Sequence, residues 1–215
     1  MKKGATELVF VLDRSGSMSH LVDDTIGGYN SFLERQREEP GDCVLTTALF
    51  DDRFELLHDR INLRGIAPLT RRDYSVRGST ALLDALGQSI HKMINVQRAT
   101  AEPERAEKVV FVVITDGMEN ASHEYTLRQI RALIERQKAE FGWEFIFMGA
   151  NIDAVSVAEG IGIDACRSVT YRADAEGTSL NYRVLDEAIT DIRAGRPLAK
   201  SWKERIEQDV RKRGK

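Results

Sequence analysis

Short apolar runs alternate along this chain with longer segments of helical period, and this alternation restricts the possible folds more than any other feature. The most apolar run spans residues 108–115 and carries five valine and isoleucine side chains. A strand that is buried on both faces has this composition, whereas a half-exposed strand alternates apolar and polar residues. The pattern therefore predicts an α/β domain in which helices cover both faces of a mostly parallel sheet.

Six segments have the length and composition of strands. They cover residues 7–12, 43–50, 53–57, 108–115, 144–148 and 166–171, and helical patterns cover 18–33, 81–96, 126–139, 154–159 and 179–194. Only Asp51 and Asp52 separate the second strand from the third, and so short a link permits only antiparallel pairing. We therefore expect a Rossmann-like three-layer sandwich with six strands, one of them an antiparallel edge strand.

The length and charge of the chain favour one domain with a tail. We expect a domain over residues 1–197 of the 215-residue chain and a basic helical tail over residues 198–215. Residues 200–215 carry seven Lys/Arg and three Asp/Glu, a net charge of +4, which leaves −7 for the body of this chain of net charge −3. A solvated helix is the plain interpretation of the tail, and contact with nucleic acid is the alternative.

The cysteines and the N-terminus indicate a compartment. Cys43 and Cys166 lie in separate apolar segments and are expected to be buried, reduced thiols. The apolar run that follows Met1-Lys2-Lys3 is too short for a signal peptide, and no run approaches the roughly 18 apolar residues of a membrane-spanning helix. We therefore expect a cytoplasmic protein that does not contact a membrane.

Carboxylate and hydroxyl side chains gather where strands end. Asp13, Ser15 and Ser17 follow the first strand, Asp116 follows the most apolar strand, and Thr80 precedes the second helical segment. Oxygen ligands of this kind suit Mg²⁺ or Mn²⁺. Two carboxylates neutralise such a cation only in part, so we expect an open position that attracts an anionic group.

Each of these side chains also has a simpler explanation. Asp13, Ser15, Ser17 or Thr80 is a possible helix N-cap, and Asp116 with the following glycine is a possible turn. The five together, in this order, favour the metal site. Neighbouring residues are expected to shape its rim, and these are Arg14, Met18, Glu119 and Asn120.

The segments 13–18, 78–80 and 113–117 resemble the metal-ion-dependent adhesion site of von Willebrand factor A domains. The resemblance extends over residues 7–194. It implies that Asp13, Ser15, Ser17, Thr80 and Asp116 hold Mg²⁺ or Mn²⁺, and that an Asp or Glu of a protein partner completes the coordination. Likeness to stand-alone bacterial members implies an adaptor in a cytoplasmic complex, with an ATPase as one potential partner.

Enzyme functions have weaker support. Ser15 stands where a haloacid dehalogenase has its second carboxylate, and the Gly-x-Ser-x-Gly and Gly-x-x-x-x-Gly-Lys patterns do not occur. A metal-dependent hydrolase stays open as the alternative, with His20 or His123 as the general base. We expect a non-enzymatic binding module without a small-molecule substrate.

Overall fold

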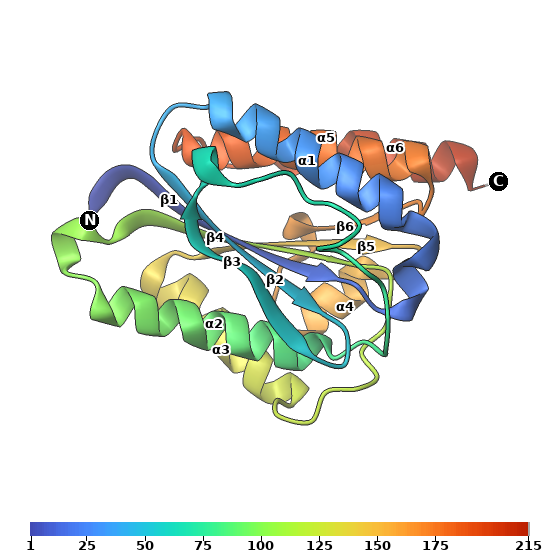
Figure 1. The fold of residues 1–215 in the computed structure, drawn as a ribbon, viewed down its shortest axis with the longest axis horizontal. Helices are drawn as coiled ribbons and strands as arrows, with labels where there is room; N and C mark the ends of the chain where they lie inside the picture. Colours follow the sequence, from blue (N-terminus) through green and yellow to red (C-terminus); the bar gives the residue numbers. More distant parts are fainter. Residues whose placement is uncertain (215) are drawn as a thin grey trace.

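The computed structural model describes residues 1–214, so the last residue of the predicted tail, Lys215, lies outside the described part. The six strands form one sheet in the order β3-β2-β1-β4-β5-β6 (Figure 1). The strands are β1 (Lys2–Asp13), β2 (Cys43–Phe50), β3 (Phe54–Asn62), β4 (Ala106–Thr115), β5 (Glu144–Ala150) and β6 (Ser168–Tyr171). The α-helices are α1 (Val22–Glu38), α2 (Leu82–Ala99), α3 (Leu127–Phe141), α4 (Ala154–Gly160), α5 (Ala175–Arg193) and α6 (Glu204–Arg213).

Strand pairing confirms the predicted mixed sheet. β1 lies at the centre and pairs in parallel with both β2 and β4, while β3 pairs antiparallel with β2 at the edge. The remaining pairs, β4 with β5 and β5 with β6, are parallel. The chain leaves β1 toward β2 and later returns to β4 on the other side of β1. The strand order therefore reverses between β1 and β4, and open α/β sheets bind ligands at the carboxyl ends of the strands at such a point.

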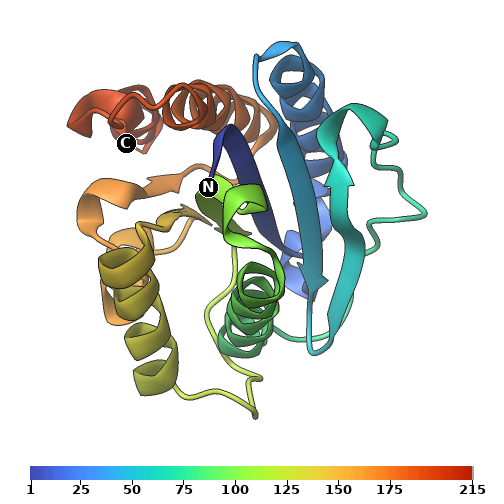
Figure 2. The same ribbon diagram turned by 90° about the vertical axis from the view of Figure 1, so that its left-hand side faces the viewer.

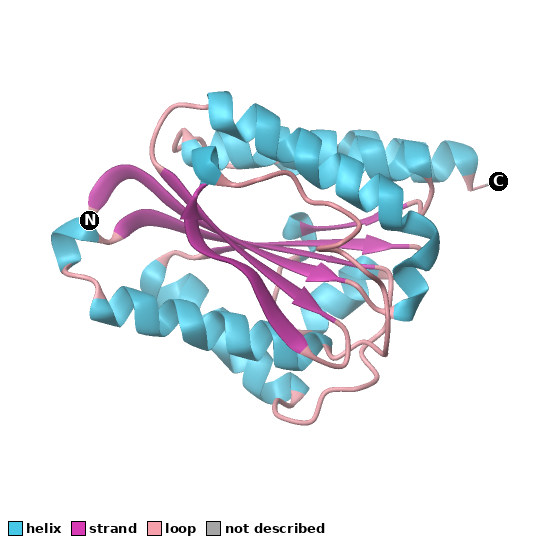
Figure 3. Cartoon of the chain, viewed as in Figure 1, coloured by secondary structure: helices cyan, strands magenta, loops and turns pink. Residues whose placement is uncertain are grey.

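Helices cover both faces of the sheet and form the predicted three layers (Figure 3). Helices α1, α5 and α6 lie on one face, and α2, α3 and α4 lie on the other. Successive residues of β1 point to opposite faces, so Phe10 joins the core under α1 and α5 while Val11 joins the core under α2 and α3. Residues 109–115 are buried throughout, which confirms the predicted two-sided burial of this strand.

The element boundaries differ from the predicted ones where local hydrogen bonds decide them. The predicted helix over 18–33 is a 3-10 turn, Gly16–Leu21, followed by α1. The predicted last helix begins earlier, at Ala175, because the Asp174 carboxylate caps it by accepting a hydrogen bond from the Gly177 N–H at 2.8 Å. The third strand, predicted over residues 53–57, where apolar and polar residues alternate, extends to Asn62.

The basic tail packs on the domain, contrary to the expectation of a solvated helix. Ile206 of α6 is only 1% exposed and belongs to the core under α5. Trp202 donates its indole N–H to the Cys166 carbonyl at 2.8 Å, and the Lys203 ammonium donates to the Ser168 carbonyl at 2.7 Å. The tail therefore covers the end of the sheet at β6 (Figure 2). That residues 1–197 form a domain of their own stays a prediction.

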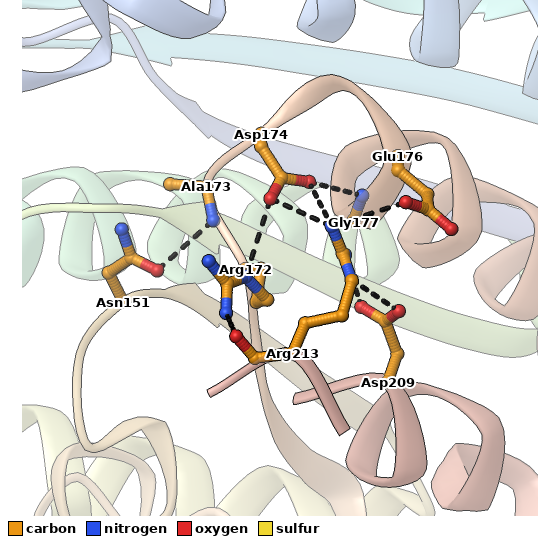
Figure 4. A network of polar contacts seen from close by, with 8 residues as sticks. All are labelled: Asn151, Arg172, Ala173, Asp174, Glu176, Gly177, Asp209 and Arg213. Carbon is orange, nitrogen blue, oxygen red and sulfur yellow. Dashed lines mark hydrogen bonds and ion pairs between the residues drawn. The ribbon is translucent and has the colours of Figure 1, made fainter. Parts of the chain in front are cut away.

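Polar contacts also bind the end of α6 to the start of α5 (Figure 4). The Arg213 guanidinium lies 2.9 Å from the Asp174 carboxylate that caps α5, and it also pairs with Asp209 and Glu176. The Arg172 side chain donates to the Arg213 carbonyl. Much of the basic charge of the tail thus forms ion pairs and hydrogen bonds with other groups of the same chain.

One of the two cysteines departs from the prediction. Cys43 is buried at the start of β2, but Cys166 is exposed, because the last strand begins only at Ser168 and Cys166 lies in a 3-10 turn before it. Both are free thiols. Within residues 1–214, no helix has the combination of length and apolar character that crossing a membrane requires.

Candidate metal centre

The carboxyl ends of β1 and β4 lie side by side and bring together the three segments that the sequence singles out. Asp13 is the last residue of β1, Asp116 directly follows β4, and Thr80 lies just before α2. A backbone hydrogen bond from the Gly16 N–H to the Gly78 carbonyl, at 3.1 Å, connects the first segment to the one that carries Thr80. All three segments meet at the carboxyl edge of the sheet, where open α/β sheets bind ligands.

Hydrogen bonds connect four of the five predicted ligands. The Asp13 carboxylate accepts the Ser15 N–H at 2.7 Å, and the Ser15 and Ser17 hydroxyls lie 3.0 Å apart. The Ser17 hydroxyl donates to the Asp116 carboxylate at 2.5 Å. The four side chains therefore form one continuous polar cluster that joins the end of β1 to the end of β4.

The fifth predicted ligand, Thr80, is placed by its contact with Gly117. A Cβ atom added to Gly117 would lie 2.6 Å from the Thr80 hydroxyl oxygen and 3.4 Å from the Ser17 hydroxyl oxygen. Glycine at this position therefore lets the backbone come close to both hydroxyls, and any other side chain would collide with Thr80. The structure thus brings all five predicted residues together. Their binding of a metal stays a prediction.

The cluster contains two carboxylates that lack a positive partner. Neither Asp13 nor Asp116 forms an ion pair with any described side chain. Burial raises the pKa of the fully buried Asp13 to about 6, although the Thr115 hydroxyl donates to this carboxylate at 2.5 Å and opposes the shift. Burial also raises the pKa of Asp116. Charged carboxylates are thus costly here unless a cation compensates them.

The donor set and its surroundings fit a hard divalent cation. Carboxylate and hydroxyl oxygens are the ligands that Mg²⁺ and Mn²⁺ prefer.

The simpler explanation, that these hydroxyls cap helices, fails for Ser15 and Thr80. Ser15 begins the 3-10 turn without a side-chain capping bond, and the N-cap position of α2 is occupied by Ala81, so Thr80 lies one residue before it. The two hydroxyls are therefore not used as helix caps.

A network of ion pairs around the buried Asp51 connects segments next to the cluster, and nothing in the sequence singles it out. The Asp51 carboxylate, fully buried in the turn after β2, accepts from the guanidinium groups of Arg14 and Arg77 at 3.0 and 2.7 Å. Its backbone carbonyl accepts the Ala81 N–H at 2.8 Å. The sequence shows Asp51 only as a turn residue, because its arginine partners come from distant segments.

Two residues expected at the rim lie inside the molecule instead. Arg14 is 3% exposed because its guanidinium turns inward to Asp51, and Met18 is fully buried in the core under α1. Tyr74 makes a further contact that the sequence does not predict, since its hydroxyl donates to the Asp13 carbonyl at 2.5 Å. Glu119 and Asn120 do lie beside the site, on the loop that follows Asp116.

The two candidate histidines lie on loops of the same edge. The His20 ring lies 2.9 Å from the Ser17 carbonyl, and His20 lowers the pKa of Asp116 by charge, although burial has the larger and opposite effect. His123 lies on the loop between β4 and α3. This loop packs against the start of α2, where the His123 backbone N–H donates to the Asp84 carboxylate at 2.8 Å. Farther along this edge, Asn151 accepts the Ala173 N–H at 3.1 Å and so joins the ends of β5 and β6 (Figure 4).

Comparison with known proteins identifies the fold. No protein-family model matches the sequence, and no curated protein sequence matches it either. Solved structures do match. A mussel byssus protein, proximal thread matrix protein 1, with zinc in its MIDAS motif, is 16% identical with a TM-score of 0.61, and the match covers 87% of this chain and 46% of that one.

Two further structures match in the same way. Manganese-loaded TRAP protein of Plasmodium vivax is 16% identical with a TM-score of 0.57, over 84% of this chain and 72% of that one. A von Willebrand factor type A protein from Catenulispora acidiphila is 12% identical with a TM-score of 0.57, over 86% of this chain and 42% of that one. The chain spans less than half the length of the mussel and Catenulispora proteins. The strand order, the helical layers and these matches show that the chain has the fold of a von Willebrand factor A domain.

Proposed function

We propose that this chain is a divalent-metal-dependent protein-binding module. Asp13, Ser15, Ser17, Thr80 and Asp116 would hold Mg²⁺ or Mn²⁺, and a protein partner would supply an Asp or Glu side chain as a further ligand. The observation that carries this proposal is a buried carboxylate, Asp13, and a half-buried one, Asp116, which form no ion pair with any described side chain and lie among hydroxyls at the carboxyl edge of the sheet. When bound, the cation supplies positive charge that a carboxylate from outside can coordinate.

The burial of the five residues supports access from one side. Asp13, Ser15 and Thr80 are buried, Asp116 is half-buried, and Ser17 is exposed. The inner side chains are therefore held by the protein, while the side near Ser17 faces solvent. A partner's acidic side chain would approach from there, and its charge would complement the partly neutralised cation.

The structural matches are consistent with this proposal. One matched structure is described as having zinc in its MIDAS motif and another as manganese-loaded. A pilus adhesin, SpaC of Lactobacillus rhamnosus GG, also matches, with 12% identity and a TM-score of 0.64 over 89% of this chain and 30% of that one. We further propose an adaptor role in a cytoplasmic complex, with an ATPase as a candidate partner, by analogy with stand-alone bacterial members of the family.

Metal titration tests the proposal directly. Adding Mg²⁺ or Mn²⁺ to protein first stripped with chelator should raise the midpoint of thermal unfolding, because a ligand that binds only the folded state stabilises it. The Asp116→Ala variant should lose this shift, since it removes one of the two carboxylates. Absence of a shift in the wild-type protein, or an equal shift in Asp116→Ala, would contradict the proposal.

A matched control separates the site from general charge effects. Glu38 is exposed at the last residue of α1, outside the cluster of five. Glu38→Ala changes the net charge by the same amount as Asp116→Ala and should retain the full metal-dependent shift. Capture of partners from native extract, with and without chelator, would then test whether protein binding depends on the same five residues.

A further inference from the structure

We infer that Asn120 is a positioning residue for the proposed metal site, because it fixes the segment that carries Thr80 to the loop that carries Asp116. This inference rests on the proposed function. It adds that metal affinity depends on a side chain that is not itself a ligand.

Asn120 and Thr80 form a reciprocal pair of hydrogen bonds. The Thr80 N–H donates to the Asn120 side-chain oxygen at 2.9 Å, and the Asn120 N–H donates to the Thr80 carbonyl at 3.0 Å. Asn120 follows Asp116 by four residues on the same loop. The pair therefore connects two of the three segments that make up the site.

The loop that carries Asn120 is itself held in place. The Glu119 carboxylate accepts the backbone N–H groups of Ala121 and Ser122 at 3.0 and 2.8 Å, and also that of Leu83 in the first turn of α2 at 2.9 Å. The Asp84 carboxylate accepts three more backbone N–H groups of this loop, at 2.8 to 2.9 Å. A loop fixed to the start of α2 in this way can position Thr80 through Asn120.

The Thr80 hydroxyl depends on this backbone anchorage. No hydrogen bond from the Thr80 hydroxyl to any described residue is observed, so its own contacts do not orient it. Its backbone is held by Asn120 and, at the next residue, by the Ala81 N–H donated to Asp51. A cation site requires each oxygen at a defined distance, so loosening this backbone should weaken binding.

The expected effect is a loss of metal affinity without a loss of the fold. Asn120→Ala removes the oxygen that accepts the Thr80 N–H, while the backbone bond in the other direction is retained. Asn120 is exposed, so its replacement removes little packing. Groups that orient metal ligands change affinity about 10- to 100-fold when they are removed, and we expect a decrease in that range.

Calorimetric titration of Mn²⁺ and Mg²⁺ into metal-free protein provides the test, with urea unfolding in chelator as a second readout. Asn120→Asp retains the acceptor oxygen and should bind at least as tightly as the wild type. Gln88→Ala is the matched control, because it removes only the 3.0 Å bond from Gln88 to Glu124 at the far end of the same loop. It should bind like the wild type.

The outcomes separate this inference from the proposed function. If the wild type binds no metal, the proposed function is wrong and the inference is wrong with it. If the wild type and Asn120→Ala bind equally tightly, only the inference is overturned. Hydrogen exchange on metal-free wild-type protein gives a test independent of variants. The Thr80 amide should be protected by Asn120, and exchange at the rate of a free loop would also overturn the inference.

Discussion

Asp13 shows at the scale of one residue why a cation would be favoured at the proposed site. Its carboxylate is fully buried and accepts hydrogen bonds from the Ser15 N–H and the Thr115 hydroxyl, but no described cationic side chain pairs with it. Hydrogen bonds recover only part of the lost hydration of a buried charge. The residue is therefore suited to ligand binding at the expense of metal-free stability.

Asp13→Asn should make the metal-free protein more stable at pH 7.5. The amide removes the buried charge and can donate to the Thr115 oxygen, while the Thr115 hydroxyl turns to the Gly117 carbonyl, 3.2 Å away. Urea unfolding in chelator should show an increase of about 1–3 kcal/mol in the free energy of unfolding. The variant should also lose the response to Mg²⁺. A metal-free variant less stable than the wild type would show that the charge itself supports the fold.

The two thiols should differ in reactivity. Burial raises the pKa of Cys43 to about 11, so roughly 0.1% of it is thiolate at pH 8, whereas Cys166 is exposed. Iodoacetamide at pH 8 should therefore modify Cys166 and leave Cys43 intact, as measured by peptide mass spectrometry. The Cys166→Ser variant should react only after unfolding in urea. Rapid modification of Cys43 in the folded variant would contradict the buried position.

At the scale of elements, adjacent glycines in α1 have different roles. A Cβ atom on Gly28 would lie 2.1 Å from the ring of Tyr182 in α5, so the glycine lets the two helices pack closely. The neighbouring Gly27 is exposed, and a Cβ atom added there would have no neighbour within 4 Å. Close packing against another helix thus explains one of the two glycines.

These glycines give a matched pair of variants. Gly28→Ala should lower the free energy of unfolding by about 1–3 kcal/mol, because the ring of Tyr182 must move. Gly27→Ala should raise it by up to about 1 kcal/mol, because alanine favours the helix and meets no neighbour. Urea unfolding followed by circular dichroism measures both changes. Equal effects of the two substitutions would show that α1 and α5 do not pack as closely as described.

The sequence predicts those elements whose signals are local. The two-residue turn at Asp51 identifies the antiparallel edge strand, and the uniformly apolar segment before Asp116 identifies the buried central strand. The five candidate ligands can be grouped from the sequence because they adjoin the carboxyl ends of strands, which lie at one edge of a parallel sheet. Their resemblance to a known motif adds to this.

The features that the sequence does not reveal depend on contacts between distant residues. Arg14 has the polarity of a rim residue, and only its partner Asp51 from another turn shows that it is buried. Cys166 has apolar neighbours, but the late start of β6 exposes it. Composition likewise makes the basic tail look solvated, whereas one isoleucine and several hydrogen bonds attach it to the domain.

For the molecule as a whole, the tail should contribute substantially to stability. Ile206→Ala should lower the free energy of unfolding by about 2–4 kcal/mol, because it leaves a cavity in the core under α5. Deletion of residues 198–215 should lower it further, since it also uncovers β6. Lys212→Ala is the control, because this side chain is exposed, and it should change stability by less than about 0.5 kcal/mol. A deletion variant as stable as the full chain would contradict this prediction and show that the tail is a solvated helix.

The course of β1 makes the two ends of the chain unequal as attachment points. Its twelve residues run from the amino ends of the strands, near Met1, to Asp13 at the carboxyl ends, a path of about 35 Å in extended chain (Figure 1). Arg213, by contrast, is bonded at the carboxyl edge, beside the start of α5. A protein immobilised through its N-terminus on a sensor surface would therefore present the edge that carries the proposed metal site outward, whereas a linker at the other end would crowd that edge.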